Sequence, residues 1–174
     1  MTCAKRVLDM CCGPRMFWFN PAHEETVFCD IRSETHVVPD KSSAGGRREI
    51  RVRPDVVADF RELPFARGAF DLVVFDPPHF VRNGGAGWVH KKYGTLAEGW
   101  ESDLRRGFSE AFRVLKPGGF LVFKWNESDI RVSRVLALAQ TEPLFGHKSG
   151  KNSQTHWMLF TKSLDMCLRE EVFS

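Results

Sequence analysis

The chain has 174 residues, of which 43% are hydrophobic and 27% are charged, a balance that fits one globular domain and excludes a disordered protein. The net charge of +3 is too small to identify a partner by itself, so the placement of the basic residues matters more. No apolar run approaches the roughly 20 residues of a membrane span, and a strand is predicted almost from the first residue, so we expect neither a membrane helix nor a signal peptide.

The five cysteines include no C-x-x-C pair, which argues against a zinc site or a redox motif, and we expect no metal. Their number is odd, and two of them, Cys11 and Cys12, are adjacent. This usage favours reduced thiols and a cytoplasmic protein. Cys11 and Cys12 are interpreted as small packing residues rather than as nucleophiles.

Three short apolar segments in the first sixty residues each end in an acid. They are predicted strands that end near Asp9, Asp30 and Asp59. The glycine turn at residues 11–13 follows the first of them and lets a ligand approach the backbone closely. An acid after the second strand suits the two hydroxyls of a ribose, and an acid followed by Phe60 suits the amine and the ring of an adenine. Together these features predict an adenosine pocket.

Two long polar segments, residues 31–49 and 80–99, are predicted to be flexible loops. A loop as long as the second one is usually functional when it occurs in a compact domain. It places basic residues among aromatic ones, a combination to which unstacked bases bind. The members of this group are Trp88, Lys91, Lys92 and Tyr93. A second basic cluster, Arg47 to Arg53, fits a phosphate-binding rim and a solvated surface equally well.

The apolar run from Phe70 to Phe75 is predicted to be a buried strand. It is followed by an acid, two prolines and two rings, Asp76-Pro77-Pro78-His79-Phe80. Proline has no backbone N–H and holds the preceding residue extended, so this segment is a rigid row of carbonyl acceptors beside a carboxylate. In open α/β sheets, ligands bind at this end of the strands. The segment is therefore predicted to be the substrate side of a site, with a turn that merely shapes the loop as the alternative.

The second half of the chain alternates between helical and extended patterns. A helix is predicted over residues 100–115, a strand over 120–125, a helix over 129–140, and an antiparallel pair of strands over 144–147 and 156–161. Strands that alternate with helices predict an α/β fold with a doubly wound, mostly parallel sheet, which ends here in a C-terminal antiparallel hairpin. We expect one domain over residues 1–174.

Over roughly residues 5–162, these features resemble the class I S-adenosylmethionine-dependent methyltransferases, which implies a Rossmann-like sheet of seven strands. Residues 7–13 look like the first motif of that family, with Cys11 where glycine is common. The Leu-Lys-Pro-Gly-Gly turn at residues 115–119 is typical of the fold. The resemblance implies S-adenosyl-L-methionine as the cofactor, bound by Asp9, Cys11, Gly13, Asp30, Asp59 and Phe60.

The segment Asp76-Pro77-Pro78-His79 is similar to the Asp-Pro-Pro-aromatic motif of methyltransferases that modify exocyclic amines of adenine or cytosine. The side chain of Asp76 and the carbonyl of Pro77 would accept the hydrogens of the amine, so that its lone pair points to the methyl donor. The aromatic position, here His79, stacks on a flipped base in such enzymes. The resemblance thus implies four catalytic residues, Asp76, Pro77, Pro78 and His79, and five base-binding residues, Phe80, Trp88, Lys91, Lys92 and Tyr93.

The expected substrate is DNA or RNA, including single strands, because the chain has no segment long enough for a separate recognition domain. A protein partner is the other way in which recognition would be supplied. Two alternatives stay open: a methyltransferase for a small-molecule or protein amine, and a non-catalytic binding module on the same fold. The departures from the family pattern at Cys11 and His79 favour the last of these.

Overall fold

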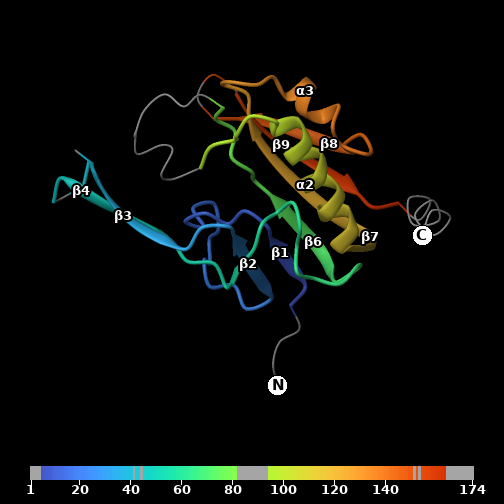
Figure 1. The fold of residues 1–174 in the computed structure, drawn as a ribbon, viewed down its shortest axis with the longest axis horizontal. Helices are drawn as coiled ribbons and strands as arrows, with labels where there is room; N and C mark the ends of the chain where they lie inside the picture. Colours follow the sequence, from blue (N-terminus) through green and yellow to red (C-terminus); the bar gives the residue numbers. More distant parts are fainter. Residues whose placement is uncertain are drawn as a thin grey trace.

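The computed structural model describes residues 5–40, 42–43, 45–81, 94–150, 152 and 154–163. A seven-stranded sheet forms the centre of the molecule (Figure 1). Its strands are β1 (Val7–Asp9), β2 (Thr26–Asp30), β5 (Val56–Val57), β6 (Phe70–Phe75), β7 (Leu115–Asn126), β8 (Phe145–Ser149) and β9 (Thr155–Thr161). They lie in the order β5-β2-β1-β6-β7-β9-β8.

The sheet is parallel except at its C-terminal edge. β1 pairs in parallel with both β2 and β6, and β6 pairs in parallel with β7. β9 runs antiparallel between β7 and β8. The chain therefore moves outward from β1 in one direction and then returns to build the other side, so the point where the order reverses lies between β1 and β6. This confirms the predicted Rossmann-like, mostly parallel sheet with a C-terminal antiparallel hairpin.

Helix α2 (Trp100–Val114) packs against β6 and β7 (Figure 1). The helical spacing places Leu104, Phe108 and Phe112 on one buried face. The ring of Phe108 lies 5.6 Å from that of Phe75 and 4.8 Å from that of Phe123, measured between centroids. The main core is thus an aromatic layer between this helix and the middle of the sheet. The predicted helix over residues 100–115 is confirmed to within one residue.

Helix α3 (Val132–Leu136) is shorter than the helix predicted over residues 129–140. Its start is delayed because the carboxylate of Glu127 accepts the N–H of Val132 and the carbonyl of Ile130 accepts the indole N–H of Trp125. After residue 136 the backbone continues in tight turns, in which Leu138 and Ala139 donate to carbonyls three residues earlier. Side-chain bonds to the backbone therefore replace helical turns at one end of this element.

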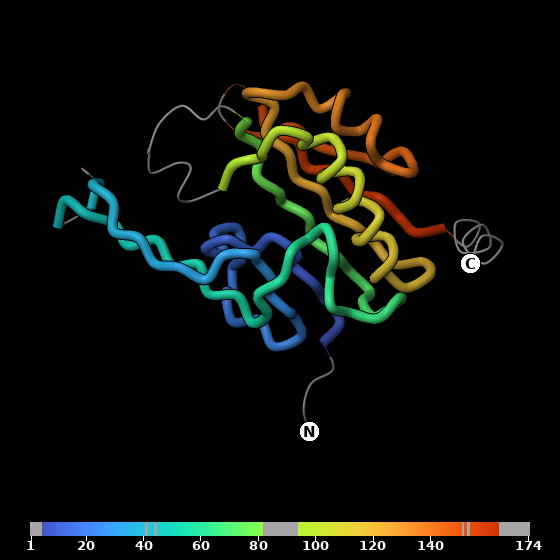
Figure 2. The backbone as a smooth tube through the Cα atoms, in the orientation of Figure 1, coloured from blue at the N-terminus to red at the C-terminus, as the bar shows by residue number. Residues whose placement is uncertain are grey.

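The prediction of a flexible loop over residues 31–49 is wrong. The chain forms a two-stranded hairpin there, made of β3 (Glu34–Pro39) and β4 (Arg47–Val52), which we name the β3–β4 arm. Valine and isoleucine at Val38, Ile50 and Val52 are buried and lie on one face of the hairpin, a period-two pattern that the polar composition of the segment hides. The arm starts just after β2 and projects away from the sheet (Figure 2).

Candidate active site

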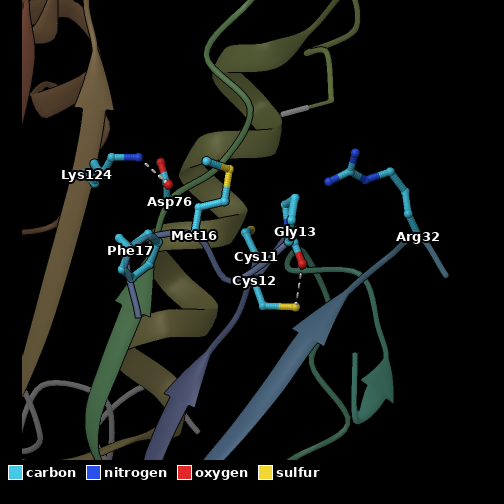
Figure 3. A pocket seen from close by; sticks show the side chains of 9 residues that line it. Cys11, Cys12, Gly13, Met16, Phe17, Arg32, Asp76 and Lys124 are labelled. Atoms are coloured by element: carbon cyan, nitrogen blue, oxygen red, sulfur yellow. Dashed lines mark hydrogen bonds and ion pairs between the residues drawn. The ribbon is translucent and has the colours of Figure 1, made fainter. Parts of the chain in front are cut away.

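Two adjoining cavities lie at the carboxyl ends of β1, β2 and β6 (Figure 3 shows the larger one). The larger cavity has a volume of about 200 Å³ and is lined by Cys11, Cys12, Gly13, Pro14, Met16, Phe17, Arg32, Asp76 and Lys124. The smaller, about 50 Å³, is lined by Met10, Cys11, Asp30, Ile31, Arg32, Ala58, Phe60, Asp76 and Pro78. Cys11, Arg32 and Asp76 line both, so the cavities meet at these three side chains.

The glycine turn after β1 is held by the acid at the end of β2. The backbone N–H of Gly13 donates to Oδ2 of Asp30 at 2.9 Å, and Gly13 has a φ of 47°, which glycine adopts without strain. Asp30 is buried and also accepts three hydrogen bonds from Arg32. Cys11, Gly13 and Asp30, three predicted cofactor ligands, are therefore brought together at one end of the sheet.

Asp9 lies beneath this turn rather than in the wall of either cavity. It is fully buried, and its carboxylate accepts the indole N–H of Trp18 at 2.7 Å and the backbone N–H of Cys11 at 3.3 Å. Burial raises the pKa of Asp9 to about 7, although both hydrogen bonds act in the opposite direction. The structure thus places Asp9 as a support for the turn, and a direct cofactor contact stays a prediction.

The predicted adenine pair is divided by the structure. The ring of Phe60 lines the smaller cavity. The carboxylate of Asp59 instead binds the guanidinium of Arg61 at 2.6 Å, and Arg61 also reaches Asp103 of α2 at 2.9 Å. Hydrogen bonds from Arg61 lower the pKa of Asp59. Asp59 therefore fixes the chain beside Phe60, while the ring itself faces the cavity.

Asp76 is paired with a lysine that the sequence-based site omits. The Nζ atom of Lys124 lies 2.5 Å from Oδ2 of Asp76 (Figure 3). The centroids of the Phe17 and Trp157 rings lie 5.5 and 5.6 Å from this ammonium group. Burial raises the pKa of Asp76, and the charge of Lys124 opposes that shift. In the sequence, the signal for this pair is a single lysine within an apolar strand. In the structure, Phe75 pairs with Phe123 in parallel strands, so the residues that follow them, Asp76 and Lys124, lie side by side.

His79 packs into the protein interior. Its residue is only 7% exposed, and its ring lies 4.3 Å from the ring of Phe80 and 6.2 Å from that of Trp125, between centroids. Burial lowers the pKa of His79 to about 4, so the imidazole is neutral near pH 7. The linings of the two cavities include Pro78 but neither His79 nor Phe80. In this structure the ring packs on protein, and its stacking on a base stays a prediction.

Four predicted base-binding residues, Trp88, Lys91, Lys92 and Tyr93, lie outside the described residues. Within the described ranges, no group of three or more His, Cys, Asp or Glu side chains is arranged to hold a metal ion. None of the helices in the same ranges is both long enough and apolar enough to cross a membrane.

The thiols near the site are protonated at neutral pH. Burial raises the pKa of Cys12 and of Cys29 to about 12, and it also raises the pKa of Cys11, with the charge of Asp30 acting in the same direction. A thiol that keeps its proton is a poor nucleophile. These values agree with the interpretation of Cys11 and Cys12 as packing residues.

No protein-family model and no curated protein matches this chain. Solved structures resemble it in fold. A protein from Pyrococcus horikoshii is 18% identical with a TM-score of 0.59, covering 94% of this chain and 84% of its own. A SAM-dependent methyltransferase from Methanosarcina mazei is 14% identical with a TM-score of 0.55, covering 94% and 95%.

A TehB-like SAM-dependent methyltransferase from Corynebacterium glutamicum is 19% identical with a TM-score of 0.55, covering 92% of this chain and 81% of its own. At such identities a structural likeness informs about the fold and not about the chemistry. The agreement extends over nearly the whole chain in all three cases. We conclude that this chain has the Rossmann-like fold that these methyltransferases share.

Proposed function

We propose that this chain transfers a methyl group from S-adenosylmethionine to an exocyclic amine of adenine or cytosine in DNA or RNA. The observation that carries the proposal is the position of Asp76. It lines both the cavity beside the glycine turn and the cavity beside Phe60. The acid of the acceptor motif thus borders both parts of the proposed cofactor pocket, so an amine bound to it would lie close to the methyl donor.

The residues around the cavities fit S-adenosylmethionine, which supplies a methyl group activated on a sulfonium sulfur. We assign the carboxylate of Asp30, at the end of β2, to accept a ribose diol in place of its two bonds to the guanidinium of Arg32. Phe60 and Ala58 offer apolar surface to an adenine ring in the same cavity. The turn with Cys11 and Gly13 borders the larger cavity, where it would hold the methionine part. Two of the compared structures are described as SAM-dependent methyltransferases, which supports this assignment.

An exocyclic amine is a weak nucleophile because its lone pair is delocalised into the base. Lys124 binds Oδ2 of Asp76, and we assign Oδ1 to accept a hydrogen of the amine. Since the ammonium group opposes the effect of burial on the Asp76 pKa, it helps to keep this carboxylate charged. An anionic acceptor at a fixed place orients the lone pair, so catalysis would come from positioning and electrostatics.

The β3–β4 arm supports a nucleic acid as the substrate. Four exposed arginines follow or belong to β4: Arg47, Arg48, Arg51 and Arg53. Two acids, Asp40 and Glu49, pair with Arg48 and Arg51, so positive charge exceeds negative charge along this strand. The arm starts just after β2, next to Ile31 and Arg32 of the smaller cavity. We therefore infer that it meets a phosphate backbone while the base enters the site.

The test is transfer of a labelled methyl group to single- and double-stranded DNA and RNA, followed by nucleoside analysis. We expect label on the amine of adenine or cytosine. Asp76→Ala should lower transfer at least about 100-fold, while calorimetry shows unchanged binding of S-adenosylhomocysteine. Asp71→Ala is the matched control, because Asp71 lies on β6, the strand that Asp76 follows, but pairs with Arg6 and Lys116 on the surface.

Three results would contradict the proposal in different ways. An Asp76→Ala variant that still transfers methyl groups would refute the role of Asp76 as the acceptor of the amine hydrogen. Label on a free amine but not on nucleic acid would favour the small-molecule or protein-amine enzyme. Absence of cofactor binding by the unmodified chain would favour the non-catalytic module over both enzymes.

A further inference from the structure

Asp30 has no hydrogen-bonding capacity left for a ligand in this structure. A carboxylate offers about four lone-pair positions. Oδ1 accepts the backbone N–H of Arg32 at 2.9 Å and its Nε at 3.0 Å. Oδ2 accepts the N–H of Gly13 at 2.9 Å and Nη2 of Arg32 at 3.2 Å. Two of these four donors are backbone groups that fix the turn, and the other two belong to one guanidinium group.

A ribose diol would need the two positions that this guanidinium holds. The side chain of Arg32 is 22% exposed, so it has a path away from Asp30. A second carboxylate is close by, since Oε1 of Glu34 lies 3.7 Å from Nη1 of Arg32. Release from Asp30 therefore does not leave the guanidinium without a counter-charge.

The same guanidinium lies beside the acceptor motif. A Cβ atom placed on Gly94 would be 3.8 Å from Cζ of Arg32 and 3.1 Å from Cγ of Pro78, so both groups border this glycine. Arg32 also lines both cavities together with Asp76, and Lys124 lies on the wall of the larger one. Arg32 thus borders the two proposed cofactor cavities and lies close to Pro78 of the acceptor motif.

We propose that Arg32 is a specificity-determining residue that binds a phosphate of the substrate once a cofactor ribose has displaced it from Asp30. This inference rests on the proposed function. A planar guanidinium binds phosphate with two parallel hydrogen bonds, as it binds Asp30 in this structure. The substrate class is then a nucleotide or strand whose phosphate lies next to the target base, and the cofactor binds before it.

The test uses Arg32→Gln in the full chain, with Arg32→Lys and Arg6→Gln as companions. Removing the guanidinium removes the competitor for Asp30, so S-adenosylhomocysteine should bind up to about 5-fold more tightly. The KM for an oligonucleotide should rise at least about 10-fold, because a charge-assisted phosphate contact is lost. Arg32→Lys should recover part of the KM, and Arg6→Gln, at the opposite end of β6, should change neither value.

A second measurement compares a nucleoside with its 5′-monophosphate as methyl acceptors. The unmodified chain should prefer the phosphate-bearing form, and Arg32→Gln should lose that preference. A purely structural role for Arg32 would weaken both cofactor and substrate binding, whereas our proposal predicts effects of opposite sign.

The two proposals fail in distinguishable ways. If the unmodified chain does not bind S-adenosylhomocysteine, the proposed function is wrong, and this inference falls with it. If the chain binds the ligand and transfers methyl groups, but Arg32→Gln weakens ligand binding or leaves the phosphate preference intact, the role of Arg32 alone is refuted.

Discussion

The two halves of the sheet are held together by different interactions. Around β6, β7 and β9, aromatic side chains such as Phe108, Phe123 and Phe160 pack into one apolar layer under α2. Around β1, β2 and β5 the strands are short, and carboxylates that bind backbone N–H groups add to the apolar packing. These bonds join Asp9 to Cys11, Asp30 to Gly13 and Asp55 to Phe28.

An arginine has a central place in the polar half. Arg15 donates to the carbonyls of Pro21 and Arg53 at 2.7 Å and to Asp55 at 3.0 Å, and its guanidinium lies 3.8 Å above the ring of Phe28. Its φ of 56° is unusual for a residue with a side chain. Directional bonds of this kind can be exchanged for bonds to a polar ligand, whereas apolar packing cannot. The turn with Cys11 and Gly13 and the acid Asp30 accordingly lie in the polar half, and Asp76 and Lys124 face them from the ends of β6 and β7.

The largest expected effect is in the apolar half. Phe108→Ala should lower the free energy of unfolding by about 3–5 kcal/mol, because a fully buried ring is removed from a packed layer. Denaturant-induced unfolding measures this loss. Phe120→Ala is the control, since Phe120 lies on β7 but is 44% exposed. Equal losses for the two variants would show that the aromatic layer does not dominate stability.

The polar half should respond to pH. The pKa of Asp9 is raised from 3.8 to about 7, so between these values the unfolded chain releases a proton that the folded chain keeps. Stability due to this group therefore falls as the pH rises, by up to about 4 kcal/mol. The difference in unfolding free energy between the unmodified chain and Asp9→Asn should decrease accordingly from pH 4 to pH 8.

For Asp71→Asn, the same experiment should give a pH dependence of opposite sign. Hydrogen bonds from Arg6 and Lys116 lower the pKa of Asp71, so its contribution is present at neutral pH and is lost as the pH falls through the lowered pKa. The difference between the unmodified chain and this variant should therefore increase with pH. If the difference in unfolding free energy between the unmodified chain and Asp9→Asn does not change with pH, burial does not raise the pKa of Asp9.

The smallest expected effect tests the contact between the halves. A Cβ atom on Gly107 of α2 would lie 2.6 Å from Cζ of Phe75 and 2.8 Å from Cδ2 of Phe60. Gly107→Ala should therefore cost about 1–3 kcal/mol of unfolding free energy, and it should weaken cofactor binding by moving Phe60. Gly45→Ala is the matched control, because no atom lies within 4 Å of its added Cβ. If Gly107→Ala leaves the affinity for the cofactor unchanged, Phe60 does not contribute to cofactor binding.

The sequence was sufficient for features that depend on local pattern. Alternation and helical spacing located the central strands and α2, and acids at strand ends located Asp30 and Asp76. The pairing of Lys124 with Asp76 depends on the register of two strands that are far apart in the chain. Likewise, the direction of the Asp59 carboxylate depends on Arg61 and Asp103, which no local pattern reveals. The position of Arg32 at the site was not predicted, because the polar composition of residues 31–49 indicated a loop.

Strand β1 has a consequence for the order of folding. It is three residues long and lies between β2 and β6, with Val7 paired to Leu72. That pairing joins residues 65 positions apart (72 − 7), whereas Val7 and Thr26 of β1 and β2 are 19 positions apart (26 − 7). We expect β1 to pair with β2 first and with β6 later. A nascent chain would then lack the Asp76 side of the site until β6 has been synthesised, however early β1 and β2 leave the ribosome.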